Sequence, residues 1–349
     1  MSAVPPPRAV VVGTTSWGCT LAVQLDRAGT AVSVLCRTAD EVRQLASERE
    51  QRRLLPGIAL PESIHFTTNF DGLDAVDLII FAVPSQRLRE SLASVLPMAP
   101  GPLPPLLSAS KGIEGGRALR MSQVIQEELV AAGLQAPVAV LSGPNIAREV
   151  ALGQASTAVI ASDDPDLPAR IRPLLMTPTF RVYTNTDIIG SELGGALKNV
   201  IAIGVGIGDG MEVGANGRAA FLTRGLAEMA RLGVGLGGRP LTFAGLTGLG
   251  DLIATAGSPR SRNRYVGEQL GRGSSLTEIL AGMVHVAEGV ETTRGARYLA
   301  QQAGVDMPII DAMYRVLFEG LRPTDAIQEL MTRQAGDELA GLPEIFPSR

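Results

Sequence analysis

Short, apolar, β-branched runs alternate with helical segments through the first half of this chain. Ala9–Gly13 is a short β-branched run, Thr30–Leu35 alternates as a strand does, and Asp77–Val83 is a continuous apolar run. Uninterrupted apolar runs are typical of parallel strands that are buried on both faces. The pattern recurs at Leu106–Ser108, Val138–Leu141 and Thr157–Ala161. Strands that alternate with helices in this way predict a parallel, doubly wound sheet with right-handed crossovers.

The pattern changes near Thr186, and from there to about residue 335 the periodicity is helical. We therefore predict an α/β protein with an N-terminal Rossmann-like doubly wound sheet followed by an all-α C-terminal domain. The dinucleotide-binding domain would span residues 1–186 and the helical substrate and catalytic domain residues 187–349. The tail, Gly341–Arg349, holds two prolines and is expected to be loosely ordered.

Composition excludes several classes of function. Two cysteines, Cys19 and Cys36, cannot form a disulfide framework or a four-cysteine zinc site, and two histidines, His65 and His285, disfavour a multi-histidine centre. We therefore expect no metal and no catalytic histidine. A net charge of −4 argues against nucleic-acid binding.

The apolar runs are too short for export or membrane insertion. Ala9–Val12 is shorter than a signal-peptide core, and Val200–Gly208 is shorter than the ~20 residues that a membrane-spanning helix needs. We expect a cytoplasmic protein without a membrane span.

The turn after the first strand resembles part of a dinucleotide-binding fingerprint. Gly13 permits a tight turn and Gly18 permits close packing of helix on strand, but Thr15 stands where the middle glycine of G-x-G-x-x-G is expected. A Cβ there should displace the cofactor or shift the loop. Arg37 ends the second strand, where a guanidinium pairs with a 2′-phosphate, which favours NADP(H) over NAD(H). A plain βα turn and a solvated arginine are the alternatives.

Three loops fall at the carboxyl edge of the predicted sheet, where ligands bind in open α/β folds. They follow Phe81, Ser108 and Leu141, and the second carries Lys111 while the third carries Gly143. Lys111 lies where a phosphate or carbonyl would arrive, although a surface lysine is the simpler reading. Gly143 would otherwise belong to a turn that leads into a helix.

A lysine stands within an apolar helical segment. Glu192 and Lys198 are the charged residues between Ile188 and Gly208. Gly194 and Gly195 lie on the helical face of Lys198, where they would clear space for another group to approach the lysine. Burial lowers the pKa of a lysine toward neutrality, which suits acid/base catalysis. A lysine that snorkels from a helix contact is the alternative.

Two further stretches carry charged or polar groups. Asp251, in a glycine-rich apolar setting, would hold the Lys198 ammonium or cap a helix. The segment Ser261–Arg264 gathers two cations and several donors at an expected helix start, which suits a phosphate, with a solvated basic turn as the alternative.

Together these motifs resemble the bacterial NAD(P)-dependent glycerol-3-phosphate dehydrogenases, over nearly the whole chain from Val10 to Arg333. Four blocks occur in family order: SASKGIE (Ser108–Glu114), GSELGGALKNVIAIGVGIGDG (Gly190–Gly210), GLGDLIATA (Gly248–Ala256) and SRNR (Ser261–Arg264).

The resemblance implies a role for each matching residue. Lys198 would be the catalytic proton donor or acceptor, with Asp251 beside it. The implied substrate-binding residues are Lys111, Gly143, Asn145, Ser261, Arg262 and Asn263. The implied cofactor-binding residues are Gly13, Ser16, Trp17, Gly18, Arg37, Lys111, Ala147, Arg262, Val286 and Glu288.

This chain departs from the family pattern mainly at the nucleotide end. The usual GAGSWG has Thr14 and Thr15 at its second and third positions, and Leu35 and Leu54 replace a tryptophan and a tyrosine. Asn145 stands where the family has a substrate-binding serine. The departures bear on cofactor affinity and preference rather than on the lysine.

The implied reaction is reversible hydride transfer between NADPH, or NADH, and dihydroxyacetone phosphate, which gives sn-glycerol 3-phosphate for glycerophospholipid synthesis. NADP(H) is the expected cofactor, with NAD(H) possible, and the expected assembly is a homodimer. The alternatives are a related NADP-dependent β-hydroxyacid dehydrogenase, which would not need the Ser261–Arg264 phosphate site, and a non-catalytic cofactor-binding regulator.

Overall fold

The computed structural model describes residues 5–71, 75–99, 101–284 and 286–334. His285 and the tail Gly341–Arg349 lie outside the described residues. The chain divides into two compact units, one of residues 1–110 and 121–188, the other of residues 111–120 and 189–349. The short segment that carries Lys111 therefore belongs to the second unit.

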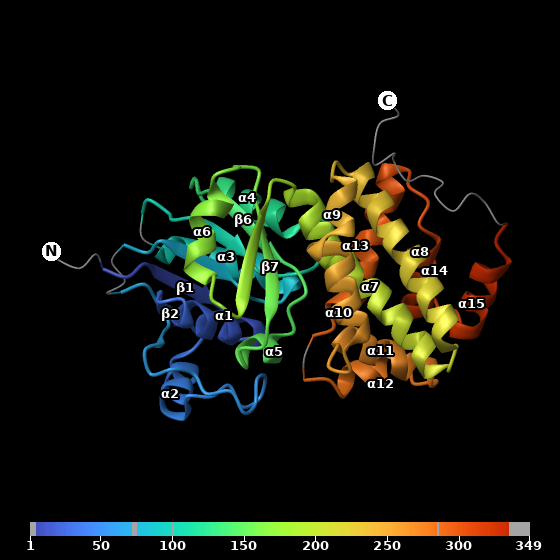
Figure 1. The fold of residues 1–349 in the computed structure, drawn as a ribbon, viewed down its shortest axis with the longest axis horizontal. Helices are drawn as coiled ribbons and strands as arrows, with labels where there is room; N and C mark the ends of the chain where they lie inside the picture. Colours follow the sequence, from blue (N-terminus) through green and yellow to red (C-terminus); the bar gives the residue numbers. More distant parts are fainter. Residues whose placement is uncertain (1–4, 72–74, 100, 285, 335–349) are drawn as a thin grey trace. The chain divides into compact units, whose positions relative to one another are not determined.

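The first unit is built on a sheet of eight strands in the order β3-β2-β1-β4-β5-β6-β7-β8. Its strands and helices are coloured from blue to green in Figure 1. The strands are β1 (Arg8–Val12), β2 (Ala31–Leu35), β3 (His65–Thr67), β4 (Leu78–Phe81), β5 (Leu106–Ser108), β6 (Val138–Ser142), β7 (Ser156–Ala161) and β8 (Phe180–Asn185). The order 3-2-1-4-5-6 is that of the doubly wound dinucleotide-binding fold, with its switch point between β1 and β4. The expectation of a Rossmann-like sheet is confirmed.

Helices of the first unit connect these strands, as the sequence predicts. They are α1 (Ser16–Arg27), α2 (Ala39–Glu48), α3 (Leu88–Val95), α4 (Met121–Ala131), α5 (Ala147–Ala151) and α6 (Leu167–Leu175). All four residues of β4 are buried, in agreement with its continuous apolar run. The threonines Thr15 and Thr38 cap α1 and α2 by accepting a backbone N–H with their hydroxyl groups.

Two features of the sheet differ from the sequence-based prediction. β7 pairs antiparallel with β6, whereas a wholly parallel sheet was expected. The five residues of α5 rise only about 7 Å, which is too little to return the chain along the sheet for another parallel strand. β3 and β8 were not predicted, since β3 has three residues and β8, at the edge, is half exposed.

The second unit is helical from residue 189 onward where the structure describes it, whereas its segment 111–120 is a turn with a bridge between Ile113 and Arg120. Its helices are α7 (Ile188–Gly210), α8 (Gly214–Gly235), α9 (Pro240–Ala244), α10 (Asp251–Gly257), α11 (Arg262–Gly271), α12 (Leu276–Ala281), α13 (Glu288–Ala303), α14 (Pro308–Phe318) and α15 (Pro323–Thr332). A π-helical turn, Leu246–Gly250, leads directly into α10.

The helix α7 forms the centre of this unit. It is long and apolar enough to cross a membrane by length and composition, but 89% of its most apolar window is buried within the protein. We therefore interpret it as a core helix. Buried side chains of α7, α8, α13 and α14 form one continuous apolar cluster around it.

A buried carboxylate joins α8 to α14. Glu228 is 2% exposed and accepts hydrogen bonds from the backbone N–H groups of Ile309 and Ile310, in the first turn of α14. Burial raises the pKa of Glu228 from 4.5 to about 7, although these hydrogen bonds act in the opposite direction.

Candidate active site

The turn between β1 and α1 requires glycine at two positions. Gly13 has φ +108°, and a Cβ there would lie 2.8 Å from Val83 Cγ1 and 2.9 Å from the carbonyl oxygen of Ala82. A Cβ on Gly18 would lie 2.0 Å from the carbonyl oxygen of Gly13. Because no Cβ tolerates such distances, the close passage of β1, α1 and β4 at the switch point depends on both glycines.

Thr15 has a structural role that the sequence did not reveal. Its hydroxyl group accepts a hydrogen bond from the Gly18 N–H at 3.0 Å and donates one to the Ala82 carbonyl at 2.7 Å. The side chain thus turns back into the loop and ties α1 to the end of β4. The loop accommodates the threonine through these two hydrogen bonds.

The polar groups of this turn fit a dinucleotide. Ser16 and Trp17 supply the first amides of α1, an arrangement that binds pyrophosphate in such folds. Trp17 also has a buried indole N–H without a partner among the described residues. A buried donor that stays unpaired is costly, which makes this N–H a candidate contact for a ligand.

Glu41 is a charged residue of the nucleotide end that the sequence analysis missed. Its carboxylate accepts hydrogen bonds from the Thr14 hydroxyl and from the backbone N–H of Arg37, the latter at 3.0 Å. It therefore joins the β1 turn to the end of β2, where the adenosine ribose binds in dinucleotide-binding folds. Both a carboxylate and the exposed Arg37 are thus present at this point.

The loop after β6 holds three further predicted residues. Gly143 has φ +123°, and a Cβ there would lie 3.2 Å from the backbone of β7, at Ala158 Cα. Asn145 donates to the Thr157 carbonyl at 2.8 Å, and its buried Oδ1 has no partner among the described residues. The carbonyl of Ala147, the first residue of α5, accepts from Thr20. Asn145 thus anchors the loop and keeps one acceptor for another group.

In the second unit, Asp251 binds two ammonium groups. Its Oδ1 lies 2.7 Å from Lys198 Nζ and its Oδ2 lies 2.6 Å from Lys111 Nζ. Lys198 also donates to Thr255 Oγ1 at 2.5 Å. The side chain of Asp251 is 2% exposed, that of Lys198 8% and that of Lys111 17%. Asp251 is the first residue of α10 but does not cap it. Of the two alternatives for this carboxylate, an ion pair with Lys198 and a helix cap, the structure shows the ion pair.

The electrostatics of this cluster suit proton transfer at Lys198. Burial lowers the pKa of Lys198 from 10.5 to about 8; Lys111 and Arg262 act in the same direction, and Asp251 opposes them. Burial alone would raise the pKa of Asp251, but the two ammonium groups outweigh it and keep that pKa below 3.8. Lys198 can therefore hold or release a proton near neutral pH beside a permanent carboxylate.

Glycines bring the carboxylate to the lysine. A Cβ on Gly194, one turn before Lys198, would lie 2.6 Å from the Thr247 carbonyl, and a Cβ on Gly248 would lie 2.1 Å from the Phe243 carbonyl. Gly194 therefore makes room for the π-helical turn that leads into Asp251. Thr255, which the sequence analysis left without a role, lies four residues after Asp251 and so on the same helical face.

The segment Ser261–Arg264 forms the start of α11. Ser261 caps the helix by accepting the Arg264 N–H at 3.2 Å. Arg262 is exposed, whereas Asn263 is buried and its amide is engaged: Nδ2 donates to Asn199 Oδ1 at 2.8 Å and Oδ1 accepts the Gly289 N–H at 2.9 Å. Asn263 thus joins α11 to α7 and α13.

Two predicted cofactor residues lie at the start of α13. Val286 is 47% exposed, and Glu288 is the first residue of the helix and interacts electrostatically with Arg262. The predicted residues thus form two groups, each within one unit. Gly13, Ser16, Trp17, Gly18, Arg37, Gly143, Asn145 and Ala147 lie in the first unit, and Lys111, Lys198, Asp251, Ser261, Arg262, Asn263, Val286 and Glu288 lie in the second. Among the described residues, no group of three or more His, Cys, Asp or Glu side chains is arranged to hold a metal ion.

Comparisons with known proteins agree with this chemistry. Residues 8–167 match the model of the N-terminus of NAD-dependent glycerol-3-phosphate dehydrogenase, and residues 187–328 match that of its C-terminus. The chain is similar to glycerol-3-phosphate dehydrogenase [NAD(P)+] of Chlorobium limicola, with 46% identity over 94% of this chain and 98% of the relative. The enzyme of the same name from Streptomyces coelicolor is 46% identical over 95% and 98%. Among solved structures, glycerol-3-phosphate dehydrogenase from Coxiella burnetii superimposes with a TM-score of 0.88 at 35% identity, over 95% of this chain and 100% of that one.

Proposed function

The chain belongs to the NAD-dependent glycerol-3-phosphate dehydrogenase family, and from that premise we propose which of its residues carry out each part of the reaction. The enzyme is an NAD(P)-dependent oxidoreductase that acts on a CH–OH group. It interconverts dihydroxyacetone phosphate and sn-glycerol 3-phosphate, the backbone of glycerophospholipids. The bound nicotinamide supplies or accepts the hydride.

Lys198 is the proton donor to the C2 oxygen when dihydroxyacetone phosphate is reduced, and the proton acceptor in the reverse direction. The observation that carries this assignment is the buried ion pair of Lys198 with Asp251 at 2.7 Å. The carboxylate orients the ammonium, and burial holds the pKa of Lys198 at about 8, close to the operating pH of a cytoplasmic enzyme. The ammonium also stabilises the negative charge that develops on the substrate oxygen.

The start of α11 binds the substrate phosphate. Arg262 offers an exposed guanidinium, Ser261 keeps its hydroxyl proton as a donor while it caps the helix, and the first amides of a ten-residue helix favour an anion. Lys111 adds a second cation beside Lys198. Asn263 contributes mainly by orienting this segment, because its amide already binds Asn199 and Gly289. Binding the phosphate away from C2 positions the reacting carbon.

The first unit holds the dinucleotide. Gly13 and Gly18 allow the tight turn, the amides of Ser16 and Trp17 face the pyrophosphate, and Arg37 receives a 2′-phosphate. We propose a preference for NADP(H), with NAD(H) also accepted. Glu41 limits this preference, since a carboxylate accepts a hydrogen bond from a ribose 2′-hydroxyl but repels a 2′-phosphate.

The organisation of the enzyme is proposed on further observations. A boundary near residue 186, between a cofactor domain and a catalytic domain, is supported by the gap between the two matched segments, 8–167 and 187–328. A reducing, cytoplasmic setting is supported by the free, buried thiols of Cys19 and Cys36. A homodimer is supported by large apolar side chains that remain exposed on the helical unit, among them Leu241, Ile253 and Met331.

The test of the catalytic assignment is Lys198→Ala. Because general acid catalysis contributes roughly 10²- to 10⁴-fold, we expect kcat for dihydroxyacetone phosphate reduction to fall by about this factor. The dissociation constant of NADPH, measured by its fluorescence, should stay near that of the wild type, because the proposed dinucleotide contacts lie mainly in the first unit. A variant that oxidises NADPH with dihydroxyacetone phosphate at the wild-type rate would show that Lys198 is not the proton donor.

A further inference from the structure

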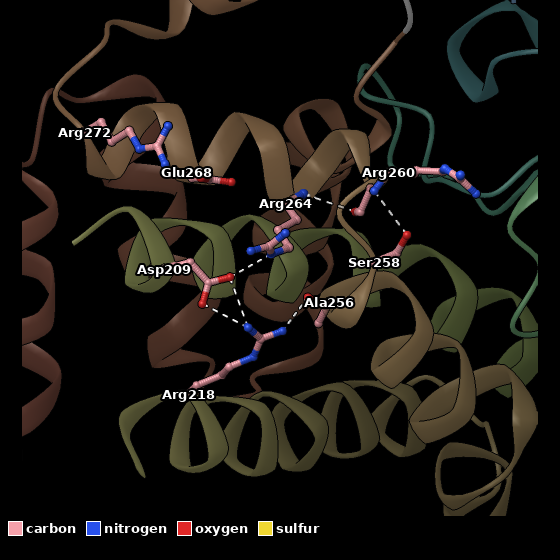
Figure 2. Close-up of polar contacts among 9 residues, drawn as sticks. Asp209, Arg218, Ala256, Ser258, Arg260, Arg264, Glu268 and Arg272 are labelled. Carbon is pink, nitrogen blue, oxygen red and sulfur yellow. Dashed lines mark hydrogen bonds and ion pairs between the residues drawn. The ribbon is translucent and has the colours of Figure 1, made fainter. Parts of the chain in front are cut away.

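A second charged cluster lies in the helical unit, at the C-terminal end of α7. It consists of Asp209, Arg218 and Arg264. Asp209 accepts a hydrogen bond from Arg264 Nε at 2.7 Å and hydrogen bonds from Arg218 Nη1 at 3.0 and 3.2 Å (Figure 2). The side chains of Asp209 and Arg264 are 18% and 19% exposed, so solvent screens this pair only partly.

The position of Asp209 on its helix is unfavourable by itself. It lies in the last turn of α7, where the macrodipole disfavours a carboxylate. Two guanidinium groups, one from α8 and one from α11, compensate for this placement. The carboxylate therefore serves contacts between helices and not the stability of α7 alone.

These contacts reach both segments that carry the active-site residues. Arg218 also donates through Nη2 to the carbonyl of Ala256 at 2.7 Å, in the last turn of α10, whose first residue is Asp251 (Figure 2). Arg264 belongs to the first turn of α11, beside Arg262, and its backbone N–H is the one that Ser261 caps. One carboxylate thus connects the helix of Lys198 with the ends of α10 and α11.

The backbones of α7 and α11 pass so close to each other that a side chain would not fit at the crossing. A Cβ on Gly206 would lie 2.0 Å from the Arg264 carbonyl, and one on Gly267 would lie 1.9 Å from the Ile203 carbonyl. The two helices therefore meet backbone to backbone at this crossing. The glycines permit a close contact but do not set how far α11 slides or rotates on α7, whereas a directional ion pair beside the contact does.

We propose that Asp209 is a positioning residue, which through Arg264 and Arg218 holds the start of α11 at the distance from Lys198 that the phosphate of the substrate requires. Asp209 lies eleven residues beyond Lys198, or about 16 Å along the helix at 1.5 Å per residue, so it acts without touching the reacting atoms. The inference rests on the proposed function, in which Arg262 and Ser261 bind the phosphate.

The test is Asp209→Asn, which keeps the volume and one acceptor but removes the charge. We compare dihydroxyacetone phosphate with dihydroxyacetone, which lacks the phosphate. We expect kcat/KM for the phosphorylated substrate to fall at least tenfold, chiefly through KM, and kcat/KM for dihydroxyacetone to change less than twofold. The Kd of NADPH should be unchanged. Asp209→Glu, which restores the charge, should recover part of the loss.

Glu268→Gln is the matched control. This variant removes an ion pair of 2.6 Å between Glu268 of α11 and Arg272, the residue that follows α11; Figure 2 draws both side chains. It should leave the kinetics of both substrates unchanged. If Asp209 had only a structural role, the melting temperature would fall while KM stayed at the wild-type value, and the inference would be wrong. If Asp209→Asn does not fold, Arg264→Lys tests the same contact, with the same expected rise in KM.

Arg262→Ala separates this inference from the function on which it rests. If Arg262→Ala leaves the preference for the phosphorylated substrate intact, the proposed phosphate site is wrong. If Arg262→Ala abolishes that preference and Asp209→Asn does not reduce it, the phosphate site stands and the positioning role of Asp209 is refuted.

Discussion

Replacing Asp251 by Asn isolates the electrostatic part of the proposed mechanism. The wild-type cluster holds one carboxylate between two ammonium groups, at 2.7 Å from Lys198 and 2.6 Å from Lys111. The asparagine has nearly the same shape but carries no charge. Lys198 would then share its buried site with the Lys111 ammonium and would lose its carboxylate partner, so the protonated form of Lys198 loses its main support.

The size of the effect follows from the burial of the pair. Removing one partner of a buried ion pair costs about 3–5 kcal/mol. If about 3 kcal/mol falls on Lys198, its pKa drops by roughly two, because 1.36 kcal/mol corresponds to one pKa unit. Starting from a pKa of about 8, the protonated fraction at pH 7.5 then falls from about three quarters to a few per cent.

The assay is the pH dependence of kcat/KM for NADPH oxidation by dihydroxyacetone phosphate. Reduction needs the ammonium form of Lys198, so activity is lost as the pH rises through its pKa; oxidation of glycerol 3-phosphate needs the neutral amine and gains activity over the same interval. In the wild-type enzyme, the fall in reduction activity and the rise in oxidation activity should both be centred near pH 8. In Asp251→Asn both should move about two pH units toward acid.

Two outcomes would refute this reasoning. If Asp251→Asn is slower at every pH but its activity still changes with pH around pH 8, Asp251 does not control the pKa of Lys198. If the wild-type limbs in the two directions do not mirror each other, a single group does not serve as both donor and acceptor. Glu268→Gln should reproduce the wild-type profile, because its exposed ion pair belongs to a different part of α11.

Two further predictions concern other carboxylates. For Glu228, burial raises the pKa in the folded state to about 7 from 4.5, so the folded protein binds the proton more tightly and the associated stability is lost as the pH rises from about 4.5 to 7. Relative to Glu228→Gln, the wild-type free energy of unfolding should therefore decrease by up to about 3 kcal/mol across this interval. If urea titrations give the same difference in unfolding free energy between the two proteins at every pH, this prediction is wrong. For Glu41→Gln, loss of the negative charge near Arg37 should raise the ratio of kcat/KM for NADPH to that for NADH by about tenfold, the equivalent of 1.4 kcal/mol. An unchanged ratio would place the 2′-phosphate away from this carboxylate.

Local patterns in the sequence predicted most of the fold. The buried runs of β1, β2, β4, β5 and β6 and the helical periodicity after residue 187 are properties of neighbouring residues, and the structure has these elements within a few residues of their predicted limits. The direction of β7 and the edge strand β8 were missed, since a strand's direction depends on how the chain crosses the sheet and an edge strand has no continuous apolar run.

The candidate site was predictable where a residue stood out from its surroundings. Lys198 is conspicuous because it is a charge within an apolar helix, and Asp251 because it is a carboxylate among glycines and apolar residues. The contacts between them were less predictable. Lys111 and Asp251 are 140 positions apart in the chain, yet their side chains lie 2.6 Å apart.

The sequence by itself determined the fold class, the change from sheet to helices and the choice of Lys198 as a candidate for proton transfer, since each depends on periodicity or on one unusual residue. Tertiary structure alone decided which groups surround that lysine. It turned the Thr15 hydroxyl into its own loop, placed Gly194 against the backbone of Thr247 and engaged Asn263 between helices. It also brought Thr255, Glu41 and Asp209 into contacts that no local pattern marks. The physical reason is that pKa values, hydrogen bonds and close backbone contacts depend on distances in space, which packing sets between residues that are far apart along the chain.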